Sequence, residues 1–236
     1  MSGIVRRDGL SFSVVVPVLN EEKNINSIIE HLHTMPAANI KEIIVVDGAP
    51  ECGTLKVIRY EDVIKVSSKK GRGPQMNAGA ARATGDVLIF LHADTHLPDD
   101  GLTSIEAALH NPKVVGGAFS MRFDTKSLMV RAVARIHTLR ARVTRILYGD
   151  QAIFLRRDYF QRIGGYDDLP LMEDVEITRR IRKRGDRIEV LPQKVTSSAR
   201  RYEQDGYILC LARYLALIIL FGFGALPRFL VRLYKN

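Results

Sequence analysis

Charged side chains at the ends of apolar segments are the candidates for chemistry in this 236-residue sequence. Asp94 follows the apolar run Val87 to Leu91, which is typical of a strand buried on both faces of a parallel sheet. Ligands of open α/β sheets bind outside the carboxyl ends of the strands, so a carboxylate there can hold a divalent cation that in turn holds a phosphate. The alternative is that Asp94 and Asp99 only cap the turn and the following helix.

A second carboxylate, Asp47, ends the apolar run Glu42 to Asp47 and is followed by Gly48. At the tip of a buried strand, beside a permissive glycine, it can reach the hydrogen-bond donors of a ligand. The alternative is a turn or a helix cap.

Adjacent carboxylates, Glu173 and Asp174, begin a helical segment. The helix dipole stabilises acids in a first turn, which is the structural alternative to a catalytic role. Because adjacent side chains point in different directions, one can face the helix while the other enters a cleft as a base. Further along, Arg200 and Arg201 offer paired guanidinium groups to a diphosphate, unless nearby acids pair with them.

The segment 71–81 predicts a loop that opens into a helix of small residues. It matches neither familiar phosphate loop, because Met76 stands where the Rossmann fingerprint needs glycine and the P-loop Gly-Lys-Ser/Thr is absent. The sequence therefore argues against a dehydrogenase or an ordinary NTPase. Arg72 and Asn77 are candidates to contact a base or a phosphate, with a plain surface loop as the alternative.

Strand-like and helix-like segments alternate, which predicts an α/β fold with a mostly parallel central sheet flanked by helices. A basic amphipathic helix is expected within 125–149, a stretch without acidic residues that suits solvent, a membrane surface or an anionic acceptor. Its periodic apolar residues are Met129, Val133, Ile136, Val143 and Leu147. The expected strands are 12–19, 42–47, 63–66, 87–91, 114–121 and 152–155, and the other expected helices lie near 25–32, 71–81, 102–109 and 171–182.

The C-terminal residues 204–236 form a strongly apolar tail. Its uncharged run, Tyr214 to Pro227, is shorter than the roughly 20 residues of a spanning helix. Two short helices are expected, which would pack on the core, on a second subunit as a homo-oligomer, or on lipid. The sequence thus divides into a domain at 1–203 and a helical tail at 204–236.

The formal net charge of +9 suggests an anionic partner such as a nucleotide, a membrane surface or a nucleic acid. Nucleic acid is the least favoured, because no basic and aromatic pattern of a single-strand platform is present. Two cysteines without C-x-x-C spacing indicate a reducing compartment, and the first apolar run lacks the features of a signal peptide. We expect a cytoplasmic protein, with the inner face of the membrane as a further location.

Five motifs in order resemble the family 2 glycosyltransferases of GT-A fold, over about residues 12 to 203. A finer likeness, to a bacterial branch of arsenosugar-type biosynthesis, comes from His92-Ala93-Asp94, Gly149-Asp150-Gln151-Ala152 and Ser198-Ala199-Arg200-Arg201. The five motifs are Val15-Val16-Pro17-Val18-Leu19-Asn20-Glu21-Glu22, Val45-Val46-Asp47-Gly48, His92-Ala93-Asp94, Gly164-Gly165-Tyr166 and Met172-Glu173-Asp174-Val175-Glu176.

This resemblance implies a nucleoside-diphosphate-sugar donor, Mg²⁺ or Mn²⁺ as the cofactor, and inverting transfer to an acceptor hydroxyl. Asp94 matches the last acid of the D-x-D metal motif, and Asp174, beside Glu173, matches the proposed catalytic base. The implied donor pocket contains Pro17, Asn20, Glu21, Asp47 at the base, Arg72 at the nucleoside, Asn77, His92 and Ala93, with Arg200 and Arg201 at the diphosphate.

Two departures from the family pattern leave an alternative function open. His92 stands where D-x-D has its first acid, so metal binding rests on Asp94. The usual Gly-Ser-x-Asp-Gly has become Ala49-Pro50-Glu51-Cys52-Gly53, which changes donor recognition. The alternative is a non-catalytic module of the same fold that binds a nucleotide sugar or a membrane surface.

Overall fold

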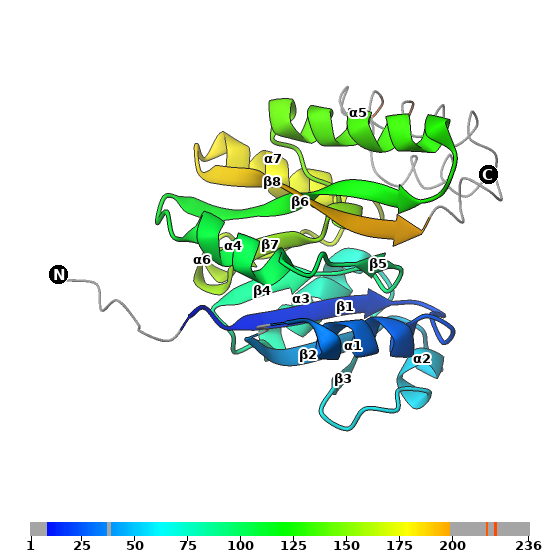
Figure 1. Cartoon of the computed structure of the whole chain (residues 1–236). Coiled ribbons are helices and arrows are strands. Elements are labelled where there is room, and N and C mark those ends of the chain that lie inside the picture. Colours follow the sequence, from blue (N-terminus) through cyan, green and yellow to red (C-terminus); the bar gives the residue numbers. More distant parts are fainter. Residues whose placement is uncertain (1–8, 37–38, 199–215, 217–219, 221–236) are drawn as a thin grey trace.

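The protein folds around one twisted sheet, whose strands lie one above another in Figure 1, from β3 at the bottom to β6 and β8 near the top. The computed structural model describes residues 9–36, 39–198, 216 and 220. Within them the sheet has the strand order β3-β2-β1-β4-β7-β6-β8-β5. The strands are β1 (Phe12–Val18), β2 (Ile40–Asp47), β3 (Ile64–Ser67), β4 (Val87–Phe90), β5 (Thr95–His96), β6 (Val114–Asp124), β7 (Ile153–Arg156) and β8 (Arg187–Ser198).

The first four neighbouring strands form the parallel part of the sheet. β1 pairs in parallel with both β2 and β4, and β2 pairs in parallel with β3. The apolar runs of β1, β2 and β4 are buried on both faces, as such strands require, whereas the edge strand β3 is half-buried or exposed along its length. Val14 and Val16 pack on one face with Ile28, whereas Val15 packs on the other with Met76. The predicted α/β fold and mostly parallel sheet are confirmed.

The second part of the sheet mixes directions. β7 lies antiparallel between β4 and β6, and β6 runs parallel to β8 from Val114 to Asp124. The short β5 pairs antiparallel with β8. The sequence analysis assigns no strand to Arg187–Ser198, because its residues alternate poorly and include Pro192.

Helices cover both faces of this sheet. Core residues of α1 and α4 belong to one apolar cluster, and those of α3, α6 and α7 belong to the other. Every helix expected before residue 199 is present, with bounds that differ by a few residues. The helices are α1 (Ile25–Thr34), α2 (Gly53–Lys56), α3 (Arg72–Arg82), α4 (Gly101–Leu109), α5 (Leu128–Thr144), α6 (Arg157–Arg162) and α7 (Glu173–Lys183), with a 3-10 turn η1 at Gly149–Gln151.

The expected basic helix is α5, which lies along β6 at the top of Figure 1. Most of the periodic apolar residues named from the sequence do not form the buried face of this helix. Val133 is buried, but Met129, Ile136 and Val143 are exposed, and Leu147 is buried beyond the end of the helix. The reason is a second, inward stripe of small and β-branched residues, which fits more closely against the sheet. Its buried members include Val130, Val133, Ala134 and Ala141.

The tail at 204–236 and its boundary at residue 203 lie outside the described residues, apart from the isolated positions 216 and 220. Their expected helices, oligomer contact and lipid contact therefore stay predictions. In the part of the chain that the structure describes, no helix combines the length and the apolar character needed to cross a bilayer.

Candidate active site

Asp174 lies in the first turn of α7, where the main chain holds its carboxylate from two sides. Gly149 N–H donates to Oδ2 and Val175 N–H donates to Oδ1, each at 2.7 Å. Met172, two residues before Asp174 and directly before α7, adopts a left-handed backbone with φ 68°, a strained conformation of the kind that gathers at functional sites. The carboxylate is therefore fixed in orientation before any ligand arrives.

Glu173 is the buried partner of this pair, with 4% of its surface exposed. Burial, reinforced by the charge of Asp174, raises the pKa of Glu173 to about 7. Burial also raises the pKa of Asp174, while the N–H bonds from Gly149 and Val175 act in the opposite direction. Glu173 therefore takes up a proton near neutral pH.

Asp150 is a third carboxyl at this point, and the sequence analysis gave it no role. It belongs to η1, next to the Gly149 that binds Asp174. Burial and the charge of Asp174 raise the pKa of Asp150 to about 6. Its Oδ1 is buried and has no hydrogen-bond partner among the described residues. The sequence signal was weak: Asp150 is the first acid after the acid-free stretch 125–149.

Arg72 is the cation that faces this acidic cluster from the start of α3. Burial is the largest influence on the pKa values of Glu173, Asp174 and Asp150 and raises all three. The charge of Arg72 is a smaller influence that lowers them, so Arg72 lies near all three carboxyls. Arg72, expected at the nucleoside, thus lies close to the Glu173 and Asp174 pair. Paired cations and buried carboxylates of this kind mark functional sites more often than plain cores.

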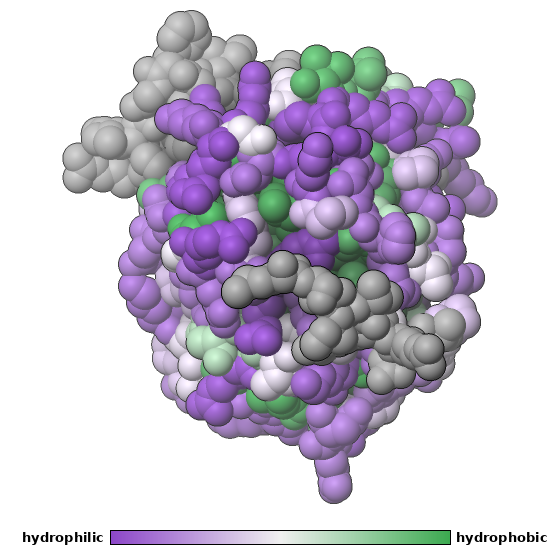
Figure 2. Space-filling model, turned by 90° about the vertical axis from the view of Figure 1, so that its left-hand side faces the viewer, coloured by the Kyte–Doolittle hydropathy of each residue, from purple (hydrophilic) through white to green (hydrophobic). Residues whose placement is uncertain are grey.

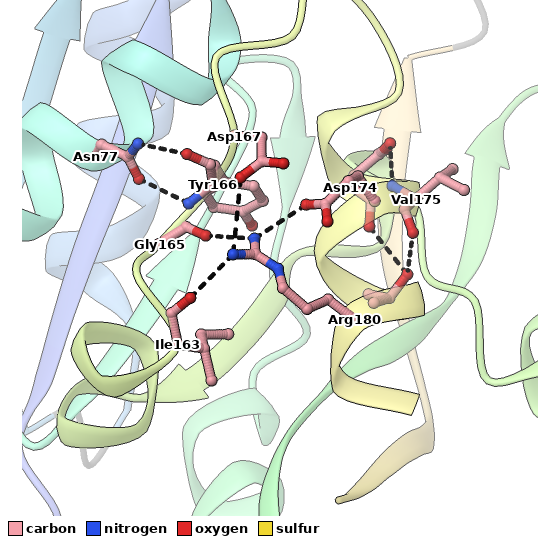
Figure 3. Close-up of polar contacts among 10 residues, drawn as sticks. Asn77, Ile163, Gly165, Tyr166, Asp167, Asp174, Val175 and Arg180 are labelled. Carbon is pink, nitrogen blue, oxygen red and sulfur yellow. Dashed lines mark hydrogen bonds and ion pairs between the residues drawn. The ribbon is translucent and has the colours of Figure 1, made fainter. Parts of the chain in front are cut away.

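The loop Gly164–Asp167 is clamped beside Asp174 from two helices, as Figure 3 shows. Asn77 of α3 donates to Tyr166 O at 2.8 Å and accepts from Tyr166 N–H at 2.9 Å. Arg180 of α7 donates to Ile163 O at 2.9 Å and to Gly165 O at 2.6 Å. Asn77 thus uses both ends of its amide on this loop, and its predicted contact with the donor stays a prediction.

Tyr166 presents its hydroxyl to the same cluster. The side chain is 3% exposed, and its Oη has no hydrogen-bond partner among the described residues. Burial, followed by the charges of Asp174 and Glu173, holds the pKa of Tyr166 well above its usual range. Tyr166 is therefore a neutral hydroxyl that can donate a hydrogen bond.

His92 and Asp94 follow β4 at the edge of the cluster. Burial and the charge of Arg72 lower the pKa of His92 to about 3, so this imidazole is neutral at physiological pH. A Cβ at Gly149 would lie 2.8 Å from His92 Nε2, so only glycine leaves room for the ring. Asp94 contributes to the raised pKa of Asp150, as the last of its causes. The charges of Asp94 and Asp174 thus both raise the pKa of Asp150, and a pocket shared by the two acids stays a prediction.

A metal site can be tested against these donors. Residues 9–36 and 39–198 contain no group of three or more His, Cys, Asp or Glu side chains placed to hold a metal ion. Mg²⁺ in phosphate-transfer sites needs only one or two carboxylates, because substrate phosphates and water supply the other oxygens. Asp94 fits that second arrangement, in which His92 contributes at most a neutral nitrogen.

The residues expected at the nucleotide surround the ends of β1 and β2. Thr54 joins two of them: its Oγ1 accepts from Glu21 N–H at 3.0 Å, and its own N–H donates to Asp47 at 3.2 Å. Asp47 is fully buried and also accepts from Ala49 N–H at 2.8 Å. This geometry supports the loop-capping alternative for Asp47, and its contact with a base stays a prediction.

Three other residues of the predicted donor pocket are described in the structure, and two are not. Pro17 is half-buried near the end of β1, and Asn20 is exposed with a left-handed φ of 58°. Ala93 is buried between His92 and Asp94. Arg200 and Arg201 lie outside the described residues.

Comparisons with known proteins point to one family. The family model "Glycosyl transferase family 2" matches residues 13–164. A probable glycosyltransferase YdaM of Bacillus subtilis is 27% identical over 209 residues, which are 78% of this chain and 49% of that protein. The glucosyl-3-phosphoglycerate synthase of Mycolicibacterium smegmatis is 27% identical over 133 residues, 47% of this chain and 44% of that protein.

Solved structures share the fold. A mannosyltransferase, PcManGT of Pyrobaculum calidifontis with GDP-Man and Mn²⁺, has a TM-score of 0.69 at 20% identity, covering 94% of this chain and 67% of that one. Glucosyl-3-phosphoglycerate synthase of Mycobacterium tuberculosis with Mn²⁺, UDP and phosphoglyceric acid has a TM-score of 0.61 at 18% identity, covering 92% and 79%. These likenesses show the GT-A fold.

The chain spans about half the length of the curated relatives it matches. The family model, in contrast, covers more than half of this chain and spans nearly all of β1 to β7, with the residues expected at the donor apart from Arg200 and Arg201. The chain belongs to glycosyltransferase family 2.

Proposed function

We propose that this protein transfers a sugar from a nucleoside diphosphate to an acceptor hydroxyl, with inversion and with Asp174 as the general base. The observation that carries the proposal is the position of Asp174, which two main-chain N–H groups fix inside a cluster that faces Arg72. A carboxylate has about four lone-pair sites. The two that remain can accept the proton of an attacking hydroxyl.

Glu173 and Asp150 keep Asp174 in its working state. Burial raises the pKa of Glu173 to about 7 and that of Asp150 to about 6, so near these pH values their protonation removes negative charge beside Asp174. The N–H bonds to Asp174 favour its charged form. We assign Asp174 as the carboxylate that receives the proton of the acceptor hydroxyl.

Two polar atoms near Asp174 suit an acceptor. The Oδ1 of Asp150 can accept a hydrogen bond, and the Oη of Tyr166 can donate one. A polyhydroxylated acceptor offers both partners, and buried polar groups without partners are costly enough to select for such a ligand. We assign Asp150 and Tyr166 to orientation of the acceptor at Asp174.

The donor is assigned to the ends of β1, β2 and β4. Relatives of this fold are solved with GDP-Man or with UDP, which supports a nucleotide sugar. The nucleoside is assigned to Pro17, Asn20, Glu21 and Asp47, and the diphosphate to Arg72, His92, Ala93, Arg200 and Arg201.

A divalent cation is assigned to Asp94 together with oxygens of the donor diphosphate. When bound, Mg²⁺ or Mn²⁺ offsets the negative charge that develops on the leaving diphosphate. The guanidinium of Arg72 supplies fixed positive charge for the same purpose. Because His92 is neutral, this chain places less negative charge at the cation than two acids would.

The test is a thermal-shift screen of UDP-, GDP- and dTDP-sugars, with and without Mn²⁺, followed by assay of nucleoside diphosphate release. We expect one nucleotide class to raise the Tm, with a larger rise in Mn²⁺, and the same donor to release its nucleotide slowly to water. The anomeric configuration of a transferred sugar, measured by NMR, checks inversion.

Each other outcome contradicts a different part of the proposal. Binding without release or transfer across a broad acceptor panel would make the chain a nucleotide-sugar binding module. Retention of the anomeric configuration would exclude a single displacement assisted by Asp174. Absence of any nucleotide-dependent Tm shift would refute the donor assignment.

A further inference from the structure

The outward face of α5 is an exposed apolar stripe. Met129, Ala132, Ile136, Leu139 and Val143 recur at alternating spacings of three and four residues, which places them on one side of a helix. Ile136, Leu139 and Val143 are 61%, 63% and 75% exposed. Figure 2 shows green side chains along the top of the molecule, where α5 lies, with purple side chains beside them. Patches of this kind mark surfaces that bind something.

A row of arginines borders this stripe. Arg131, Arg135 and Arg142 lie on the adjacent side of α5 and line a cavity of about 560 Å³ between α5, β6 and β8. Arg122 of β6 and Lys194 of β8 line the same cavity, and none of its lining residues is acidic. We call the stripe and this basic cavity together the α5 surface.

Within residues 9–36 and 39–198, no carboxylate forms an ion pair with a cation of the α5 surface. Arg122 donates to Thr196 Oγ1 at 2.7 Å and Arg142 donates to Ser120 Oγ at 3.3 Å, both neutral hydroxyls. No ion pair among the described residues includes any of its five cations. The segment 125–149 contains no acid that could pair with them.

We propose that the α5 surface binds an anionic lipid bilayer, with the apolar stripe in the acyl boundary and the arginine row at the lipid phosphates. The stripe from Met129 to Val143 spans about 21 Å at 1.5 Å per residue, a length typical of interfacial helices. Arginine forks match phosphate oxygens. This inference does not rest on the proposed transfer reaction, because α5 surface residues touch none of the assigned donor groups.

Two other occupants of the α5 surface are a second copy of the chain and its own C-terminal residues, and charge argues against both. A second copy packed face to face would bring the arginine rows of both copies together, and like charges oppose such contact. Residues 206–236 are apolar enough to cover the stripe, but they include Arg213, Arg228, Arg232 and Lys235 and no acid. Of the three surfaces, the anionic bilayer alone supplies both the apolar depth and the opposite charge.

The experiment is cosedimentation of the full chain with vesicles of phosphatidylcholine, alone or with about 30% phosphatidylglycerol. We expect at least about 10-fold stronger partitioning onto the anionic vesicles, reduced severalfold between about 0.1 M and 0.5 M salt. The double variant Ile136→Asn/Leu139→Asn should lower the partition coefficient at least about 10-fold, because it removes the inserted side chains. The double variant Arg131→Gln/Arg135→Gln should lower it by a similar factor.

Matched controls separate the α5 surface from general charge and hydrophobicity. Val57→Asn removes another exposed apolar side chain, and Lys41→Gln/Lys113→Gln removes two exposed charges elsewhere. Both controls should bind like the parent protein, and all variants should keep the parent Tm.

Three results would overturn the inference. One is that the protein binds neutral and anionic vesicles equally, or binds neither. Another is unchanged binding of both α5 double variants, which would assign the contact elsewhere in the chain. The third is a dimer in sedimentation velocity that Ile136→Asn/Leu139→Asn converts to monomer, which would show a second copy on this face.

Discussion

The two parts of the sheet treat buried charge differently. In the first part, β1 to β4, the buried carboxylate Asp47 accepts N–H bonds from Ala49 and Thr54, so its charge is compensated by the main chain. In the second part, Glu173 and Asp150 both lie near Asp174. Burial, reinforced by the charge of Asp174, raises the pKa values of these two carboxyls. The first part stabilises the charge of Asp47, whereas the second keeps Glu173 and Asp150 in surroundings that disfavour their charged forms.

This difference shows where the protein retains reactivity at the expense of stability. A carboxyl whose pKa is raised by burial is less stable in its charged form than it would be in water. Such groups persist where proton transfer needs them. The second part is therefore the region in which single substitutions should separate activity from stability.

The largest effect is expected for Asp174→Asn. It keeps the shape of the side chain but removes the proposed base, so kcat for transfer should fall about 10³-fold. The donor Kd, measured by calorimetry, should stay within about twofold of the parent value, because Asp174 is assigned to the acceptor step. Asp158→Asn, at an exposed acid of α6, is the matched control. Parent-level turnover in Asp174→Asn would remove this residue from the mechanism.

Gly117→Ala and Gly79→Ala compare packing in the two parts. A Cβ at Gly117 would lie 2.1 Å from the main-chain oxygen of Glu189, whereas a Cβ at Gly79 would lie 2.4 Å from a methyl of Val15. A side-chain methyl can move more easily than a strand backbone. We expect a loss of about 3 kcal/mol or more for Gly117→Ala and about 1–2 kcal/mol for Gly79→Ala. Urea unfolding measures both, and the reverse order would contradict the comparison.

Asn77→Ala tests the connection between the two parts. The change leaves N–H and C=O of Tyr166 without their side-chain partner, so the free energy of unfolding should fall by about 2 kcal/mol. If Asn77 acts only on this loop, the donor Kd stays within about twofold of the parent value. A larger loss of donor affinity with unchanged stability would favour the predicted donor contact. Asn39→Ala, which removes exposed bonds to Gly9 and Leu10, is the control.

The smallest effect, and one of opposite sign, is expected for Asp150→Asn. Burial raises the pKa of Asp150 from 3.8 to about 6, so the folded chain binds more protons than the unfolded chain between these values. The parent protein's free energy of unfolding therefore falls as the pH rises through this window. At pH 8 we expect Asp150→Asn to be more stable than the parent by about 1–2 kcal/mol, and about equal below pH 4.

Urea unfolding at both pH values measures this effect, with Asp158→Asn as the exposed control. An Asp150→Asn variant that is less stable than its parent at pH 8 would show that the carboxylate has a favourable partner. Because Asp150 is assigned to the acceptor, the same variant should raise the acceptor KM more than the donor KM.

The sequence predicted the first part of the sheet more fully than the second. Val14, Val15 and Val16 are continuous β-branched residues, and Val87 to Phe90 is an uninterrupted apolar run, so local composition alone indicates buried parallel strands. β8 was not predicted, because its half-polar sequence forms a strand only through its pairing with β6. The antiparallel direction of β7 likewise depends on its neighbours, since a short apolar run has no direction of its own.

The candidate site divides in the same way. Glu173 and Asp174 were predictable from an acidic pair at a helix start, and Asp94 from its place after a buried strand. Asp150 was not, because its burial comes from segments far apart in the chain and no local spacing records it. The double hydrogen bond of Asn77 to Tyr166 joins residues 89 positions apart, and a single sequence gives no sign of such a pair.

The order of strands also bears on how the protein is made. Strands β1 to β4 complete their parallel pairing with residues 12–90 alone, whereas β6 needs β8, which ends at Ser198. A nascent chain emerging from the ribosome can therefore assemble the nucleotide side before the acidic cluster exists. Long-range pairing of β6 with β8 should then be the slow step of maturation, and the buried carboxyls become concentrated only at its end.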